Sequence, residues 1–389
     1  MRPQHLIVAG AGIGGLTAAI ALARAGHTVE VLEQAPALGE IGAGVTLAPN
    51  AMRVYHHLGL AEAITAAGVE PQRQRVQHWA DGRDLVAFER GQKVRDLYGA
   101  PYVYIHRADL HAILVEALEA TGRATVRLSS PCVAAEPTEN GAIAVLAGGT
   151  EIKGDAVIGA DGVKSGVRKV FDPGEPHFTG HVVWRAIVPV EGPLLTDMAH
   201  FPGIHIGPGR MAVRYPLRNS TLLNLVFFAR QEGWAEEGWT IRADLADLRK
   251  TFQGWSSDVQ ALLDAVDPSA LYKWAVFARQ PLKTWVRGGR VALLGDAAHA
   301  MTPFLGQGAA AAIEDALVLA RAFEAASDVP EALARYEVAR KERCGFIQVE
   351  SNLNADRLEG DEAHLYGMTE IKNEETLGLF AYDAGAVEV

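Results

Sequence analysis

This sequence has few cysteines, no excess of positive charge and no long apolar run. Cys132 and Cys344 are the only cysteines among 389 residues, which predicts neither a disulfide framework nor a cysteine-based metal site. The 36 Lys and Arg are outnumbered by 47 Asp and Glu, for a formal net charge of −11. Nucleic acid is therefore not an expected partner, because phosphates need a basic surface. No apolar run reaches the ~18 residues that cross a bilayer, so we expect no membrane partner.

A targeting segment is also not recognisable before the first predicted strand. No charged and then apolar stretch with a cleavage site precedes His5, which together with the two scattered cysteines predicts a cytoplasmic protein. The composition, 49% hydrophobic and 21% charged, is typical of a globular enzyme. The length corresponds to roughly two to three domain-sized units. Since no Ser-, Pro- or Gly-rich linker separates them, we expect interleaved domains.

The first 33 residues predict one βαβ unit. An apolar strand at 5–9 is followed by a glycine turn at 10–15, an Ala-rich helix at 16–24 and a second strand at 27–33. Within the turn, Gly10, Gly12 and Gly15 fit the pattern G-x-G-x-x-G, which allows a tight turn, close approach of a pyrophosphate and close helix packing. The amides that open the helix then face the negative charge of the ligand.

A carboxylate completes this dinucleotide-binding pattern. Glu33 ends the second strand, 18 residues after Gly15, where it is expected to accept hydrogen bonds from ribose hydroxyls. The alternative interpretation is a structural turn with a surface Glu33. The unit alone leaves open whether the ligand is NAD or FAD. The remaining candidate ligand contacts here are Ile13, Gly14 and Gln34.

The rest of the chain predicts a mixed α/β fold. Buried strands are expected at 124–128, 143–146, 156–159 and 290–294, and helices at 51–58 (with Asn50 as N-cap), 109–120, 243–263 and 308–326. Alternating apolar and polar residues at 182–188, 211–215 and 222–228 predict an antiparallel sheet.

Three further motifs identify a family. They are Gly159-Ala-Asp-Gly162, Arg290-Val-Ala-Leu-Leu-Gly-Asp-Ala-Ala-His299 and Gly306-Gln-Gly308. Together with the N-terminal loop they resemble the group A FAD-dependent aromatic monooxygenases, the p-hydroxybenzoate hydroxylase superfamily. A finer resemblance is to the salicylate hydroxylase and 6-hydroxynicotinate 3-monooxygenase branch. It rests on the stretches 42–50, 105–111, 184–185, 215–218 and 382–383.

The resemblance implies a fold and its division. A Rossmann-like FAD-binding domain would be interleaved with an antiparallel-sheet substrate domain and followed by a helical C-terminal segment. The expected FAD-binding parts are 1–72, 99–178 and 271–328. The expected substrate-domain parts are 73–98 and 179–270, and the C-terminal segment is 329–389. No second G-x-G-x-x-G follows a strand, which disfavours the disulfide reductases that carry a separate nicotinamide domain.

The resemblance also assigns FAD contacts. Asp296 would hold a ribityl hydroxyl, and the amides of Gly306, Gln307 and Gly308 would face the flavin edge that becomes anionic on reduction. Alternatively, Asp296 is a helix N-cap. Arg107, two residues before a predicted helix, would contact FAD, and Asp161 would contact the FAD pyrophosphate and the reductant. The alternatives are a surface salt bridge for Arg107 and a turn residue for Asp161. His299 is interpreted as structural. The other expected FAD contacts are Gly44, Val45 and Ala309.

The expected substrate site lies on the antiparallel sheet. Strand alternation sends Tyr215 and Arg214 to opposite faces, and the resemblance favours Tyr215 as the catalytic residue, with a core tyrosine as the alternative. Arg185 and Arg214 are candidates for binding a carboxylate, although surface positions are favoured for both. Thr46 and Pro303 are expected near the flavin. Thr46 stands where 6-hydroxynicotinate enzymes have His, which weakens that particular assignment.

The implied reaction is ring hydroxylation of an aromatic or N-heteroaromatic hydroxy acid, with or without release of CO2. NADH or NADPH would reduce FAD, O2 would add at flavin C4a, and one oxygen atom would pass to the ring. We expect a monomer or homodimer. Two other classes remain open. One is an FAD oxidase or reductase without oxygen insertion, and the other is a non-catalytic dinucleotide-binding protein.

Overall fold

The N-terminal residues form the βαβ unit that the glycine pattern predicts. The computed structural model describes residues 1–39, 43–231, 233, 241–368 and 370–389. Strand β1 (His5–Ala9) leads into α1 (Ile13–Arg24) and β2 (Thr28–Leu32). Both neighbours of β1 are parallel, β2 on one side and β11 (Ala156–Gly159) on the other. Because helices and loops cover both faces of the sheet, β11 and most of β1 are continuously apolar.

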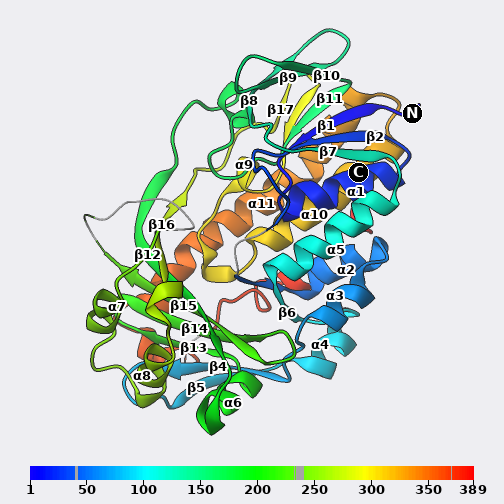
Figure 1. Cartoon of the computed structure of the whole chain (residues 1–389). Helices are drawn as coiled ribbons and strands as arrows, with labels where there is room; N and C mark the ends of the chain where they lie inside the picture. The colour runs from blue at the N-terminus through cyan, green and yellow to red at the C-terminus, as the bar shows by residue number, and fades with distance from the viewer. Residues whose placement is uncertain (40–42, 232, 234–240, 369) are drawn as a thin grey trace.

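A six-stranded sheet is built around this unit in the order β17-β18-β11-β1-β2-β7. Its strands come from three distant parts of the sequence, so the chain leaves the sheet and returns to it. Figure 1 shows this sheet at the upper end of the molecule. The bounds not yet given are β7 (Ala124–Arg127), β17 (Val286–Arg287) and β18 (Val291–Leu293).

A seven-stranded sheet lies at the other end of the molecule (Figure 1), in the order β16-β12-β15-β14-β13-β4-β5. All neighbours are antiparallel except β13 and β4, which confirms the predicted antiparallel sheet and interleaved fold class. The boundaries of the domains themselves stay a prediction. The strands are β4 (Arg73–His78), β5 (Asp84–Glu89), β12 (His177–Pro189), β13 (Gly203–Gly207), β14 (Arg210–Leu217), β15 (Leu222–Arg230) and β16 (Tyr272–Ala278).

The two faces of this sheet have different coverings. One face packs its apolar side chains, such as Trp184 and Phe227, against three short helices. Alternation along the strands turns Val183 and Phe228 to the other face, toward Phe304 and the end of the long helix α11. The short helices are α6 (Gly192–His200), α7 (Leu245–Thr251) and α8 (Ser257–Asp264).

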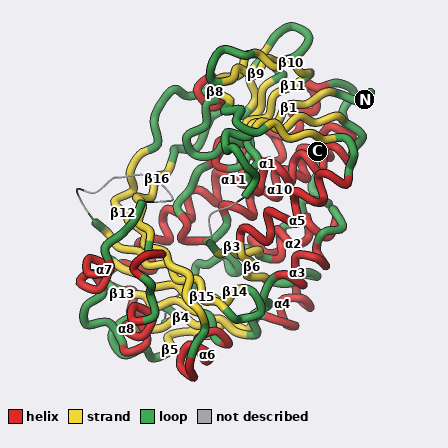
Figure 2. Tube along the Cα trace, viewed as in Figure 1, coloured by secondary structure: helices red, strands yellow, loops and turns green. Residues whose placement is uncertain are grey.

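Helices lie between the six-stranded and the seven-stranded sheet (Figure 2). Helix α10 (Gly308–Ala325) packs against α1, and α11 (Val329–Glu359) runs from the six-stranded toward the seven-stranded sheet (Figure 1). Within the described residues, no helix is both long and apolar enough to cross a membrane. The remaining helices are α2 (Pro49–His57), α3 (Ala61–Ala67), α4 (Gly91–Tyr98), α5 (Arg107–Ala120) and α9 (Asp296–His299).

Small strands complete the fold beside the two main sheets. Strands β8 (Cys132–Pro137), β9 (Ala142–Leu146) and β10 (Glu151–Gly154) form an antiparallel sheet near the first sheet, and β3 (Gly44–Leu47) pairs with β6 (Val103–His106). The β3–β6 pair brings residues 44–47 next to the start of α5, and this position matters for the site.

Three helix predictions were wrong in detail. Helix α2 begins at Pro49 with Ala48 as the N-cap, because proline is favoured at the first helical position. Asn50 therefore lies inside the helix. The predicted helix 243–263 is two helices, interrupted near Gly254, whose φ of +79° helices do not accommodate. Helix α5 begins at Arg107 itself, capped by the His106 side chain.

Candidate active site

The three glycines of the G-x-G-x-x-G pattern differ in what a side chain would meet at each position. Gly10 has a φ of +104°, and a Cβ there would lie 2.4 Å from the carbonyl oxygen of Ala160. A Cβ on Gly15 would lie 2.0 Å from the carbonyl oxygen of Gly10, so larger residues cannot pack there. Gly12 faces open space and lines a cavity, into which a side chain would project. We call the loop 10–15 the glycine cradle. This geometry fits a backbone that approaches a dinucleotide closely.

Glu33 braces the same loop from the second strand. Its carboxylate accepts hydrogen bonds from the amides of Ala11 and Ala35, each at 2.8 Å. Neither Glu33 nor the exposed Gln34 lines the cavity. Their contact with a ribose stays a prediction.

A cavity of about 600 Å³ lies between the glycine loop and the seven-stranded sheet. The structure brings most of the predicted FAD contacts together in its wall. The loop contributes Gly12, Ile13 and Gly14, and strand β3 contributes Gly44, Val45 and Thr46; Gly42 of the same motif lies outside the described residues. Arg107 lines the cavity from the start of α5. The segment before and at the start of α10 contributes Asp296, Pro303, Gly306, Gly308 and Ala309.

Asp296 is directed to the cavity and not used as a helix cap. Gly295 occupies the N-cap position of α9, and Asp296 is its first residue. The Asp296 side chain is exposed in the open cavity. Desolvation by the surrounding protein atoms nevertheless raises the pKa of Asp296, while His299 and Arg107 oppose that shift. A carboxylate in this position suits a ligand that offers hydroxyl donors.

Asp161 is occupied by its own loop. Its carboxylate accepts hydrogen bonds from the Ser165 hydroxyl and from the amides of Gly166 and Val167, the latter two at 2.7 and 3.2 Å. Asp161 does not line the cavity, although its neighbours Ala160 and Gly162 do. The geometry therefore agrees with the turn interpretation, and a direct contact with cofactor or reductant stays a prediction.

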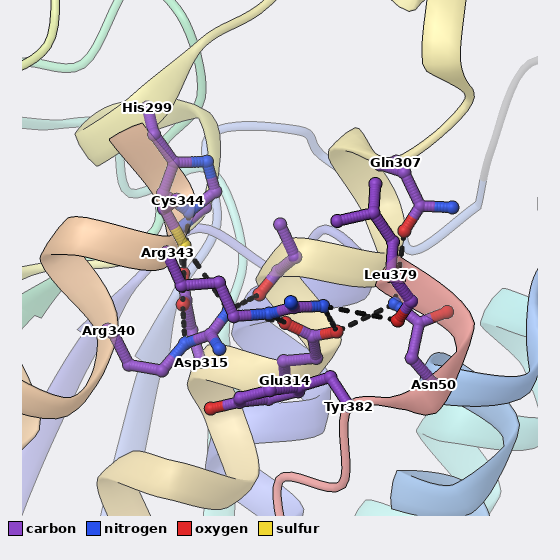
Figure 3. A network of polar contacts seen from close by, with 12 residues as sticks. Asn50, His299, Gln307, Glu314, Asp315, Arg340, Arg343, Cys344, Leu379 and Tyr382 are labelled. Carbon is purple, nitrogen blue, oxygen red and sulfur yellow. Dashed lines mark hydrogen bonds and ion pairs between the residues drawn. The ribbon is translucent and has the colours of Figure 1, made fainter. Parts of the chain in front are cut away.

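Gln307 presents its side chain away from the cavity and toward a buried polar network (Figure 3). Its Oε1 accepts a hydrogen bond from Asn50 Nδ2 at 3.0 Å, and the same nitrogen donates to Glu314 at 2.6 Å. Glu314 also accepts from Arg340 at 2.7 Å and from Arg343 at 2.8 Å. Side chains of α2 and α11 thus fix the loop that precedes α10, on the side facing away from the cavity.

The second half of this network holds the Gly295–His299 segment (Figure 3). Asp315 accepts from Arg340 Nε at 2.7 Å, pairs with His299 Nε2 at 2.7 Å and accepts from the Gly295 amide at 3.1 Å. Burial opposes ionisation of Asp315, yet His299 and Arg340 lower its pKa below its usual range. Burial likewise opposes a charged His299, but Cys344 and Asp315 raise the pKa of the imidazole well above its usual value. This ion pair supports the structural interpretation of His299.

Tyr215 lies where strand β14 meets the cavity. A Cβ on Gly44 would lie 2.3 Å from Tyr215 Cε2, so glycine makes room for this ring. The ring stacks on Tyr104, with centroids 4.6 Å apart and planes 16° apart. Burial raises the pKa of Tyr215 well above its usual value, which keeps the hydroxyl neutral and able to donate a hydrogen bond.

The two predicted arginines lie on opposite faces of the sheet. Arg185 lines the cavity, with its guanidinium 5.4 Å from the centre of the Trp274 ring. Arg214 does not line the cavity; it donates to Gln77 at 2.8 Å and to His205 at 3.3 Å. The prediction of surface positions was wrong, because only 3% of Arg185 and 2% of Arg214 is exposed. Aromatic faces and buried polar partners stabilise these charges inside the protein.

Sequence reasoning missed several polar residues of the cavity wall, including Asn224, Arg90, Tyr102 and Glu374. Asn224 accepts from the Gly44 amide at 2.9 Å, and Arg90, Tyr102 and Glu374 lie toward the end of the cavity bordered by β4 and β5. Arg90 and Glu374 pair although 284 positions separate them in the sequence. No local pattern indicates such a pair.

Comparison with known proteins identifies the family. The FAD binding domain family matches residues 4–345. The chain is 38% identical to the 3-amino-4-hydroxybenzoate 2-monooxygenase PtnB3 of Streptomyces platensis, over 94% of this chain and 89% of the relative. It is 34% identical to the 6-hydroxynicotinate 3-monooxygenase of Pseudomonas fluorescens, over 89% and 90% of the two chains.

A solved structure gives the same result in three dimensions. Klebsiella pneumoniae HpxO complexed with FAD and uric acid superposes with a TM-score of 0.83, at 28% identity, over 97% of this chain and 95% of HpxO. Family, relatives and solved structure agree with the cradle, the cavity and the two-sheet fold. The chain therefore belongs to the FAD binding domain family and is one of its FAD-dependent aromatic monooxygenases.

Proposed function

We propose that this monooxygenase hydroxylates the ring of a small aromatic acid, of the hydroxybenzoate, aminohydroxybenzoate or hydroxypyridine carboxylate class, with NADH or NADPH as reductant. One observation carries the proposal. A single cavity joins the glycine cradle and Asp296 on one side to an aromatic wall with Tyr215 on the other. The chain's relatives supply the class of substrate, since they act on 3-amino-4-hydroxybenzoate and 6-hydroxynicotinate.

FAD fits the first side of this cavity. Gly12 to Gly14 would hold its pyrophosphate and Asp296 a ribityl hydroxyl, and the amides around Gly308 would face the flavin edge. Bound FAD supplies the redox chemistry, taking two electrons from NAD(P)H and activating O2. The protein's part is to bind, orient and shield the reactants.

The second side of the cavity would hold the ring. The wall there is apolar and includes Val183, Val213, Val226 and Phe228. Such a wall would keep water away from the activated oxygen. The neutral hydroxyl of Tyr215 would donate a hydrogen bond to the substrate's phenolate, the more nucleophilic form of the ring. Arg185 is the proposed contact for a carboxylate, and Thr46 and Pro303, which line the cavity, would border the flavin.

A screen of NADH and NADPH oxidation over these acids tests the proposal, with the product mass measured under 18O2. The expected result is substrate-stimulated oxidation and a product that gains one labelled oxygen atom. Loss of CO2 would indicate attack at the carbon that bears the carboxylate, whereas a retained carboxylate would indicate hydroxylation elsewhere on the ring.

The same screen separates the alternatives. Substrate oxidation without incorporation of label would indicate an FAD oxidase or reductase. Protein that retains no FAD on purification or reconstitution would indicate a non-catalytic role. We further propose a cytoplasmic location, supported by the two free cysteines Cys132 and Cys344. The expectation of a monomer or homodimer can be checked by light scattering.

A further inference from the structure

The end of the cavity bordered by β4 and β5 carries an arginine whose donors are already used. Arg90 follows β5, is 2% exposed, and lies over the rings of Phe88 and Tyr102, each at 5.1 Å. Its Nη2 and Nε donate to Gln74 Oε1 at 3.1 and 3.3 Å, and its Nη1 donates to Glu375 at 2.7 Å. Arg90 is therefore held by the protein itself and is a poor candidate for binding a substrate carboxylate.

Two consecutive carboxylates share this one guanidinium but face different surroundings. Glu375 makes the short contact and does not line the cavity. Glu374 lies 3.5 Å from Arg90 Nη2, and its side chain lines the cavity with 16% exposure. One positive and two negative groups leave this end of the cavity with an excess of negative charge when both carboxyls are ionised.

Glu374 has a distinct place among the groups of the cavity wall. Within the described residues, the wall contains only two carboxylates, Asp296 in the FAD-binding part and Glu374 at the β4–β5 end, and no histidine or lysine. An ionised carboxylate only accepts hydrogen bonds. Burial raises the pKa of Glu374 while Arg90 opposes that shift, so a ligand that donates to the carboxylate would relieve the cost of burying its charge.

We propose that Glu374 determines substrate specificity by accepting a hydrogen bond from an amino or hydroxyl substituent of the aromatic ring. The inference rests on the proposed function and adds the recognised substituent to it. A substrate carboxylate at this end would be repelled by the carboxylates of Glu374 and Glu375. An N–H or O–H group of the substrate would instead donate a hydrogen bond to Glu374.

Ligand binding to the oxidised FAD-loaded protein tests this inference. Three ligands differ at one position only: 4-hydroxybenzoate, 3-amino-4-hydroxybenzoate and 3,4-dihydroxybenzoate. Dissociation constants are measured from the perturbation of the flavin spectrum. A hydrogen bond to a charged group predicts that the wild type binds at least one donor-bearing ligand about tenfold more tightly than 4-hydroxybenzoate. Glu374→Gln and Glu374→Leu should remove most of this preference while leaving the affinity for 4-hydroxybenzoate within about threefold.

Glu375→Gln is the matched control, because it removes the closer partner of Arg90 but no carboxylate of the cavity wall. It should keep the preference for the donor-bearing ligand. The inference is overturned if the wild type has no preference, if both Glu374 variants keep it, or if Glu375→Gln loses it to the same extent. If the wild type neither binds nor hydroxylates any aromatic acid of the panel, the proposed function fails as well.

Discussion

Asp296 and Tyr215 line the same cavity from different parts of the fold, and we expect a different role for each. Asp296 is a carboxylate that ligand hydroxyls would stabilise, whereas Tyr215 is a phenol kept neutral by burial. Removal of Asp296 should therefore weaken FAD binding. Removal of the Tyr215 hydroxyl should lower the fraction of activated oxygen that ends in hydroxylated product.

Asp296→Ala is expected to weaken FAD binding without unfolding the protein. Loss of hydrogen bonds to a charged group corresponds to roughly 1.5–3 kcal/mol, or about a 10- to 150-fold higher dissociation constant for FAD. Fluorescence titration of the apoprotein measures this constant. Asp264→Ala on α8 is the control, because it removes an exposed carboxylate that pairs with Arg249 of α7. Unchanged FAD affinity in Asp296→Ala would remove this residue from the cofactor site.

Tyr215→Phe is expected to impair hydroxylation more than flavin reduction. The variant retains the ring that stacks on Tyr104 but lacks the donor to the substrate's phenolate. A less activated ring reacts more slowly with oxygen, so the fraction of NADH consumption that ends in hydrogen peroxide should rise several-fold. Peroxide and product are quantified per NADH consumed. Wild-type coupling together with wild-type substrate affinity would show that Tyr215 only packs.

At the scale of elements, α11 holds the cofactor side of the site from behind. Arg340 is fully buried and bridges Glu314 and Asp315 of α10, and Asp315 in turn binds the Gly295 amide and His299. The positions of α9 and of the start of α10 thus depend on Arg340 of α11.

Arg340→Ala should lower the free energy of unfolding by roughly 3–5 kcal/mol, because it leaves two buried carboxylates without their shared partner. Urea unfolding followed by fluorescence measures the loss. Arg335→Ala is the control on the same helix, since Arg335 forms an exposed pair with Glu331 and should contribute no more than about 1 kcal/mol. Equal losses in the two variants would contradict the proposed role of the network.

The sequence predicted elements well where a local pattern carries the information. The βαβ unit, the 308–326 helix and the antiparallel strands follow from glycine spacing and apolar periodicity, and strand alternation placed Tyr215 and Arg214 on opposite faces. Asn50 was predicted as an N-cap, but α2 begins at Pro49. The Asn50 amide instead donates to Gln307 and Glu314, residues more than 250 positions away, which no local pattern indicates. The same limit applies to Arg90 and Glu374, since a local pattern indicates the chemistry of a residue but not its distant partner.

At the scale of the whole molecule, one buried histidine couples the fold to pH. Burial and the neighbouring Arg214 lower the pKa of His205 to about 3. The charged groups that face it are Arg214 and Asp258. In the unfolded chain a histidine has a pKa of about 6.5, so between about pH 6.5 and pH 3 the unfolded state binds a proton that the folded state does not.

The free energy of unfolding should therefore fall as the pH falls through this window, by about 1.4 kcal/mol per pH unit from this one group. Urea unfolding of the wild type and of His205→Gln at about pH 7 and about pH 5 isolates the contribution, because other titrating groups are common to both proteins. The variant should lose less stability on acidification. Equal losses would show that His205 becomes protonated in the folded state or is not buried in solution.

Residues 374–382 contact helices α2 and α11 and contribute to the cavity wall. Arg53 of α2 donates to the carbonyl oxygens of Phe380 and Tyr382, Arg343 donates to that of Leu379, and residue 374 lines the cavity. On the ribosome, the glycine cradle emerges more than 350 residues before this segment does, a delay of tens of seconds at ordinary rates of synthesis. The cradle can thus form during translation, whereas the substrate end of the cavity is completed only after release of the C-terminal segment from the exit tunnel.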